Sequence, residues 1–159
     1  MALTAYLKVK GATQGEIKGD CPQGGDKKDS ILVYAVEHNV EIPTDTHTGQ
    51  PTGQRIHHPL VVTKAIDNAS PKLYQASCQG ESCEVTLDYY RIKNDGTEEK
   101  YFTIKLAEAT VVNMNQFTPL TFLPENKPYK NMEKISFSYS KITWTYNDGN
   151  IEFTDDWKK

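Results

Sequence analysis

Histidines gather in one short stretch of this sequence. Three of the four, His47, His57 and His58, lie in HTGQPTGQRIHHPLVVTK, residues 47–64. Imidazole is a common metal ligand, so the stretch raises the hypothesis of a metal site. His57 and His58 are adjacent on an extended segment, however, and successive side chains of a strand point to opposite faces. No acidic or cysteine partner stands at a fixed spacing, so we expect neither a metal nor a cofactor.

The other reactive residue types give no stronger signal. His38 falls among Tyr34, Val36 and Val40, which predicts a hydrogen-bonded core or interface residue rather than a catalyst. The carboxylates are scattered, and although two could face each other across a barrel mouth as acid and base, a solvated surface is the better interpretation. Nucleophile-elbow, zinc-protease, phosphate-loop and dinucleotide-binding motifs are missing from the sequence. We therefore predict a binding or structural module, with no catalytic residue and no enzymatic activity.

Bulk properties exclude several further classes of protein. The length of 159 residues predicts a single domain spanning 1–159. The net charge is −3 with both signs interspersed, which argues against nucleic-acid binding. No apolar run approaches the roughly 20 residues of a membrane helix, so we expect no membrane insertion. Cys21, Cys78 and Cys83 form an odd set without a C-x-x-C motif, and we predict three free thiols.

Period-two hydrophobicity dominates the elements that must position any site. It predicts strands over 3–10, 31–42, 56–63, 83–92, 99–106, 134–146 and 150–153. The first half of 31–42 is expected to be buried on both faces. One-residue phase slips at 107–108 and 140–141 indicate a β-bulge and a corner. We predict a mainly β fold of seven or eight strands, as a small antiparallel β-barrel or two packed sheets with one short flanking α-helix and a long extended loop.

Turn and cap residues mark where these elements end. The only helix signal is DNASPKLYQAS, residues 67–77, with Ser70 predicted as N-cap and Pro71 in the first turn. Gly80 is expected to close this helix in the left-handed conformation. Asp95-Gly96 predicts a tight hairpin turn between two strands. Residues 43–55 are all turn formers, and structureless loops of this length are usually functional.

Specific strings then resemble a known family. MALTAYLKVKG, SILVYAVEHNV, TGQPTGQRIHHPLVVTKAIDNASPKLYQA and the terminal ISFSYSKITWTYNDGNIEFTDDW are similar to the haemolysin-coregulated protein family of bacterial type VI secretion systems. The resemblance covers essentially the whole chain. The segments CPQGGDKK and CQGESCE match least, and both are predicted loops, where sequence varies most.

The resemblance implies a structural tube subunit. Six copies would form a ring, and rings would stack into a hollow tube inside a contractile sheath, tipped by a spike protein. The tube would be expelled with the spike and would carry and stabilise effector proteins in its lumen. Such proteins are cytoplasmic until assembled and are then secreted without a signal peptide, and the N-terminus here shows no such signal. Relatives with a C-terminal toxin domain exist, and we expect no such extension here.

Two sets of residues follow as candidate assembly sites. The predicted loop is expected to contact a neighbouring ring or subunit, which would make its histidines incidental to chemistry. Its residues are Thr44, Asp45, Thr46, His47, Thr48, Gly49, Gln50, Pro51, Thr52, Gly53, Gln54 and Arg55. Ser136, Ser138 and Ser140 alternate on one strand face and are candidates for the wall of the lumen. The alternative is a monomeric β-barrel that binds a small ligand.

Overall fold

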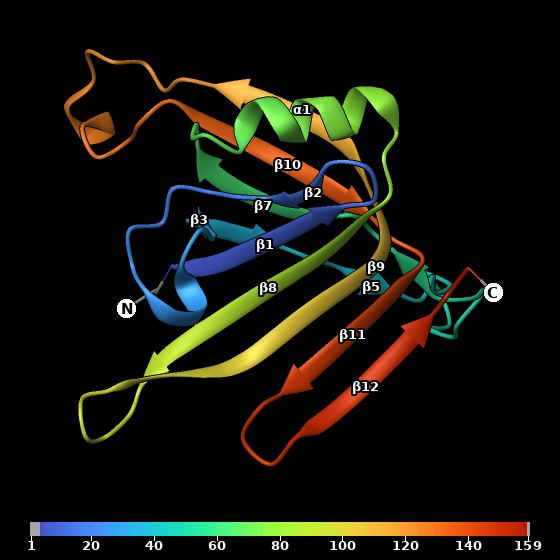
Figure 1. Cartoon of the computed structure of the whole chain (residues 1–159). Helices are drawn as coiled ribbons and strands as arrows, with labels where there is room; N and C mark the ends of the chain where they lie inside the picture. Colours follow the sequence, from blue (N-terminus) through green and yellow to red (C-terminus); the bar gives the residue numbers. More distant parts are fainter. Residues whose placement is uncertain (1–3, 159) are drawn as a thin grey trace.

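One long bent strand, β9, organises the molecule, because it takes part in both of its β-layers (Figure 1). The computed structural model describes residues 4–158. The elements, in chain order, are β1 (Ala5–Gly11), β2 (Gly15–Ile17), η1 (Gly25–Lys27), β3 (Ile31–Val33), β4 (Ala35–Glu37), β5 (Val40–Glu41), β6 (Ile56–His57), β7 (Leu60–Ala65), α1 (Ser70–Gln79), β8 (Cys83–Ile92), β9 (Glu98–Phe117), η2 (Pro124–Asn126), β10 (Met132–Ser138), β11 (Lys141–Tyr146) and β12 (Ile151–Asp156).

The strands form two antiparallel layers. The first layer runs β2-β1-β8-β9-β11-β12, with β3 paired beside β2 on the free side of β1. The second runs β9-β10-β7-β4. The chain changes layer at four places: between β3 and β4, between β7 and β8 through α1, within β9, and between β10 and β11. The mainly β prediction of two packed sheets with one helix is confirmed, and no ladder closes the strands into a complete barrel within residues 4–158.

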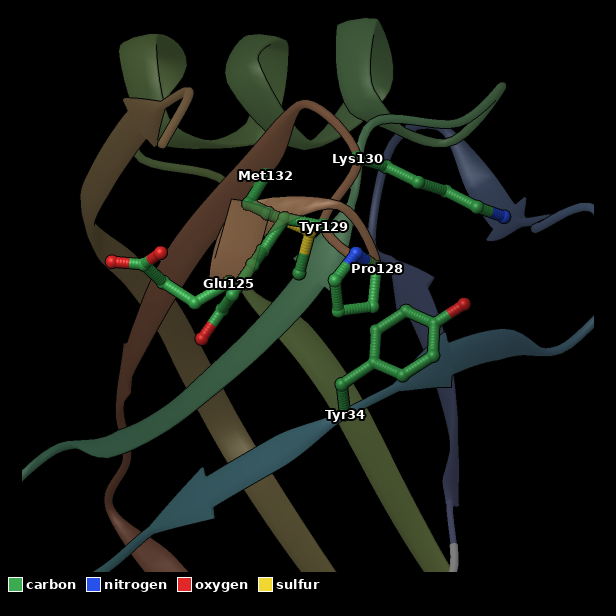
Figure 2. A pocket seen from close by; sticks show the side chains of 6 residues that line it. All are labelled: Tyr34, Glu125, Pro128, Tyr129, Lys130 and Met132. Atoms are coloured by element: carbon green, nitrogen blue, oxygen red, sulfur yellow. The ribbon is translucent and has the colours of Figure 1, made fainter. Parts of the chain in front are cut away.

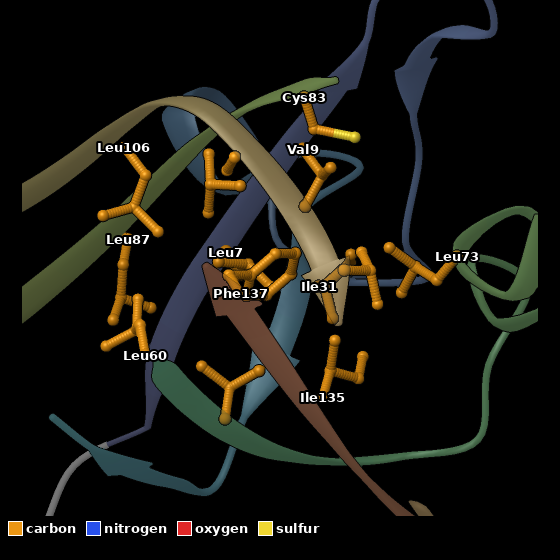
Figure 3. Close-up of a cluster of buried hydrophobic side chains, with 14 of the residues drawn as sticks. Leu7, Val9, Ile31, Leu60, Leu73, Cys83, Leu87, Leu106, Ile135 and Phe137 are labelled. Atoms are coloured by element: carbon orange, nitrogen blue, oxygen red, sulfur yellow. The ribbon is translucent and has the colours of Figure 1, made fainter. Parts of the chain in front are cut away.

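Alternating apolar residues create the core between the layers. Leu7 and Val9 of β1 point inward, and Ile135 and Phe137 of β10 meet them from the other layer (Figure 3). All four side chains are buried. Burying apolar side chains is the main favourable contribution to folding, so this period-two pattern fixes which face of each strand looks inward. The expected alternation in β1 begins at position 3, which lies outside the described residues.

Helix α1 covers one end of the layers and contacts β9 (Figure 1). It begins at Ser70 with Pro71 in its first turn, and Gly80 closes it with φ 62°, as predicted. The N-cap differs from the prediction, because Ala69 occupies that place and the Ser70 hydroxyl donates to Glu133 at 2.6 Å instead. Within residues 4–158 no helix is long and apolar enough to cross a bilayer.

Both phase slips correspond to structural breaks. The β8–β9 register shifts where Leu106 pairs with Val85 but Ala109 pairs with Cys83, and Glu108 between them has φ 51°. This is the predicted bulge, and β9 bends there from one layer to the other. The second slip is the corner between β10 and β11, where the main-chain N–H of Ser140 donates to Ala107 at 3.3 Å.

The segment 31–42 departs from the prediction of one strand. It forms three short strands, because β3 pairs with β1 in the first layer and β4 pairs with β7 in the second. Ile31 and Val33 are buried, but Tyr34 and Ala35 are exposed where the chain crosses between layers. Such interruptions raise the strand count to twelve within the described residues, against the seven or eight predicted. Burial on both faces is therefore wrong for the middle of this segment.

Candidate functional site: an arm and its anchor

A hairpin-like arm, residues 38–57, contains the whole of the predicted assembly loop, residues 44–55. At its base β5 and β6 pair antiparallel, with Val40 opposite His57, and a bridge joins Thr44 to Pro51 nearer the tip. At the tip the Asp45 carboxylate accepts the main-chain N–H groups of His47 and Thr48 at 2.7 and 3.0 Å. These bonds hold the pKa of Asp45 below its usual value. The candidate loop is thus an ordered extension rather than a structureless one.

The arm is fastened to the β-layers through one tyrosine. The Tyr139 hydroxyl lies 2.8 Å from Nδ1 of His57 and 2.6 Å from Nε2 of His38. His38 precedes β5 and His57 ends β6, so both sides of the arm's base meet at a single oxygen. Asp155 of β12 completes the contact, 2.8 Å from Nε2 of His57. We call His38, His57, Tyr139 and Asp155 the Tyr139 clamp.

Charged groups strengthen the clamp at its outer side. The Arg55 guanidinium donates twice to Asp155, at 2.5 and 2.8 Å. A bidentate arginine–carboxylate pair is among the stronger side-chain contacts. The hydrogen bond from Arg55 holds the pKa of Asp155 below its usual value, with His57 adding to the effect. Asp155 is therefore ionised at neutral pH and accepts hydrogen bonds only.

Two tryptophans enclose the histidine of the clamp. The Trp157 ring stacks on His57 with centroids 5.2 Å apart, and Trp144 lies 6.4 Å from it on a similar plane. The Trp157 indole N–H also donates to the Tyr139 carbonyl at 2.8 Å. The His57 side chain is only 1% exposed as a result. Burial, with the nearby charge of Asp155, raises the pKa of Tyr139 well above its usual range, so its hydroxyl keeps its proton.

The structure changes the interpretation of the histidines. His57 and His58 do point apart, since His58 bonds Glu41 at 2.7 Å on the surface while His57 is buried. His38 is hydrogen bonded, as predicted. His57 bonds the same Tyr139 hydroxyl, so the two histidines together anchor the arm, a structural role that was not predicted for His57. Among residues 4–158 no three histidine, cysteine or acidic side chains converge as a metal site.

The candidate wall serines are only partly brought together. Ser136 and Ser138 lie on the outer face of β10, alternating with buried Ile135 and Phe137. Ser136 has Val61 on one side and Asn113 on the other, within a mixed polar face of the second layer. Ser140 lies beyond the end of β10, at the corner into β11.

A buried ion pair was not predicted from the sequence. The Lys64 ammonium of β7 contacts the Glu133 carboxylate of β10, and both side chains are fully buried. Lys64 also donates to Asp67 at 2.9 Å and to the Ser70 hydroxyl at 3.2 Å. Both residues sit in strands at inward positions, which is where a charge breaks the expected alternation. These two charged residues at inward positions were the sequence signal that could have indicated a buried ion pair.

A surface pocket of about 400 Å³ was also missed. Tyr34 forms one side, and Tyr129, Pro128 and Lys130 of the β9–β10 connection form the other (Figure 2). It lies where the chain crosses between layers after β3, a crossing that the sequence pattern did not reveal.

The hairpin of β11 and β12 leaves apolar side chains uncovered. Ile151 and Phe153 are 69% and 63% exposed, on the same face as the stacked Trp144 ring. Figure 1 shows this hairpin extending beyond the second layer, which therefore does not cover it. Exposed apolar side chains that lie together mark surfaces used for association.

The three cysteines carry no disulfide. Cys78 is exposed, while Cys21 and Cys83 are buried. Burial raises the pKa of the Cys83 thiol to about 11, which makes it unreactive at neutral pH. The prediction of free thiols is confirmed.

Comparison with known proteins places this fold in a family. Residues 6–146 match the family model described as "Type VI secretion system effector, Hcp". The "Major exported protein" of Pseudomonas aeruginosa is 37% identical, over 99% of this chain and 97% of that protein. A second relative, YhhZ of Escherichia coli, is 27% identical over 97% of this chain but only 38% of its own length.

Solved structures agree with the sequence match. A mutant of Hcp1 from the E. coli EAEC 042 pathovar is 39% identical with a TM-score of 0.86, covering 98% of this chain and 99% of that one. Another Hcp crystal structure is 30% identical with a TM-score of 0.90, over 99% of both chains. Hcp3 of P. aeruginosa is 30% identical with a TM-score of 0.81, over 99% of this chain and 100% of that one.

Fold and match together define a secreted structural protein of the type VI secretion apparatus, from a group that is not an enzyme family. The chain belongs to the Hcp family.

Proposed function

We propose that this chain is the tube subunit of a type VI secretion system. Six copies form a ring, and rings stack into a hollow tube that lies inside the sheath, is tipped by the spike, and carries effector proteins in its lumen. In this proposal the chain is one domain, is cytoplasmic until assembled, and leaves without a signal peptide. The arm is the observation that carries the proposal, because it is an ordered extension with an anchored base and an exposed tip, as a contact with a neighbouring subunit requires.

Two surfaces of different character support assembly in two directions. A closed ring needs a heterologous contact that repeats around an axis, and stacking needs a second contact along it. The uncovered apolar face of the β11–β12 hairpin suits the first, since Ile151 and Phe153 would be buried by a neighbour. The polar tip of the arm, residues 44–55, suits the second.

Deleting residues 46–53 tests the role of the arm. Residues 46–53 form hydrogen bonds within the arm and contribute no side chain to the clamp, so the shortened chain should still fold. Light scattering after size exclusion and negative-stain images should show monomers or single rings but no tubes. A matched control replaces the same eight residues with glycine and serine. It keeps the length of the arm while removing the side chains, and so separates the effect of length from the effect of the side chains. Full-length tubes from the deletion variant would contradict this role.

The face that bears Ser136 and Ser138 is the proposed lumen wall, with Ser140 at its edge. This face is polar and uncharged at the serines, which suits a wet channel that holds a folded cargo. Ser138→Lys should abolish co-purification of an effector while rings persist. Gln75→Lys on the exposed side of α1 places the same charge away from that face and should leave co-purification unchanged. Retention of effector by Ser138→Lys would overturn the assignment of the wall.

A monomeric ligand-binding protein is the second candidate, and the pocket beside Tyr34 favours it. Its size suits a small molecule, and aromatic and lysine side chains line it. The two candidates differ in mass in solution. A species of 18.0 kDa at high protein concentration would support the monomer, and a species near six times that mass would support the ring.

A further inference from the structure

The hydrogen bonds of the Tyr139 clamp run in one direction. Asp155 is ionised and only accepts, so Nε2 of His57 carries the proton between them. In neutral His57 the other nitrogen, Nδ1, then has a lone pair and accepts the Tyr139 hydroxyl. The Tyr139 oxygen is left to accept, so Nε2–H of His38 donates to it. The donor in each hydrogen bond thus determines the donor in the next one.

This arrangement holds His38 as a neutral ring. Burial lowers the pKa of His38, and the neighbouring His57 and His58 lower it further. The carboxylates nearby are already paired, Asp155 with Arg55 and His57, and Glu41 with His58. A second proton on His38 therefore adds a positive charge that no carboxylate balances.

The other groups that face His38 do not relieve this charge. Tyr139, from the β10–β11 corner, keeps its proton because its pKa is raised. Trp144 of β11 presents a ring 6.2 Å away and has no ionisable group. On β12, Asp155 stays ionised because Arg55 holds its pKa down.

We propose that the Tyr139 clamp is an acid-sensitive anchor, which keeps the arm docked at neutral pH and releases its β5 side when His38 takes up a proton. The docked arm binds this proton less tightly than the free arm does, so acidification favours release. Docking is complete above the ordinary histidine value of 6.5 and weakens as the pH falls below it. Under the proposed function, on which this consequence rests, tubes come apart at acidic pH.

Hydrogen exchange of the arm measures the release directly. After correction for intrinsic rates, peptides from residues 38–57 of the full chain should exchange at least threefold faster at about pH 5.5 than at about pH 7.5. The ceiling is about tenfold, because the lower pH lies about one pH unit below the ordinary histidine value. Peptides from β10 serve as the internal reference. His38→Gln keeps an N–H for Tyr139 but cannot titrate, so its arm should show no such change. A smaller ratio in the wild type, or the same ratio in His38→Gln, overturns the proposal.

Two further measurements keep the test independent of that variant. His47→Gln removes the exposed histidine of the tip and should retain the wild-type pH dependence; its loss there would contradict the role of His38. In the wild type the imidazole ¹H–¹⁵N spectrum should show His38 titrating below 6.5. A His38 midpoint at or above 6.5 overturns the proposal.

Assembly is scored separately. If the wild type forms no rings at neutral pH, the proposed function fails, while arm exchange still tests the anchor. If rings and tubes form and persist at about pH 5.5 with an unchanged arm, the anchor fails and the proposed function stands.

Discussion

Tyr139→Phe isolates the energy of the anchor. The phenylalanine ring fills the same space, so the change removes the hydroxyl and opens no cavity. His57, with a side chain 1% exposed, loses the donor for Nδ1, which costs about 1–3 kcal/mol for a buried unpaired group. His38 is only half buried and can turn to water, so its loss is smaller, about 1 kcal/mol. Together the arm should lose about 2–4 kcal/mol of docking energy.

That energy predicts a local effect. At about 1.4 kcal/mol per tenfold, opening of residues 38–57 should increase roughly 30- to 700-fold, measured by hydrogen exchange at neutral pH. Peptides from β7 and β10 should be unchanged, because the hydroxyl bonds only the arm. Tyr129→Phe removes an exposed hydroxyl elsewhere and should have no effect. Arm protection in Tyr139→Phe equal to that of the wild type would refute the idea that this hydroxyl anchors the arm.

Three other outcomes follow from features outside the clamp. Lys64→Met leaves Glu133 as an uncompensated buried charge and should lower the free energy of unfolding, measured in urea, by about 3–5 kcal/mol. The double variant Lys64→Met/Glu133→Leu should recover at least half of this loss, and equal stability of the single and double variants would contradict the prediction. Gly11→Ala places a Cβ against the Glu81 carboxylate, which accepts two main-chain N–H groups of the β1–β2 turn, and should lower the free energy of unfolding by about 1–3 kcal/mol. In Gly24→Ala the added Cβ has no atom within contact distance, so thermal or urea unfolding should be unchanged. Because each chain carries a net charge of −3, tube sedimentation should increase between about 0.05 and about 0.5 M salt, and a decrease would show that attraction between opposite charges dominates stacking.

Local sequence signals predicted the features that depend on near neighbours. The Asp95-Gly96 turn, the left-handed Gly80 and the bulge before Ala109 each follow from a few adjacent residues, and the structure has all three. Hydrophobic period two likewise identified the inward faces of β1 and β10. Those patterns were sufficient for the fold class because they are set by the backbone and by burial.

The clamp depends on residues that are far apart in the sequence. His57 and Tyr139 are separated by 82 positions, and His38 and Tyr139 by 101. Nothing in a strand pattern states which distant side chain a buried histidine will meet. The pocket beside Tyr34 was missed for a related reason. The alternation of apolar and polar residues continues through the point where the chain leaves one layer and joins the other. Both the clamp and the pocket depend on which distant strands pair with each other, which the periodicity of the sequence does not specify.

The shared strand β9 also determines how the molecule carries mechanical load. The anchor of the arm sits at the corner after β10, whose flanking strands β10 and β11 both pair with β9. A pull on the arm is therefore passed to β9 through two ladders of hydrogen bonds on opposite sides of its bend. Strands pulled along their length load many such bonds at once, whereas strands pulled apart sideways break them singly. Under the proposed function, an axial pull on the arm that runs along these strands would meet the first, more resistant geometry.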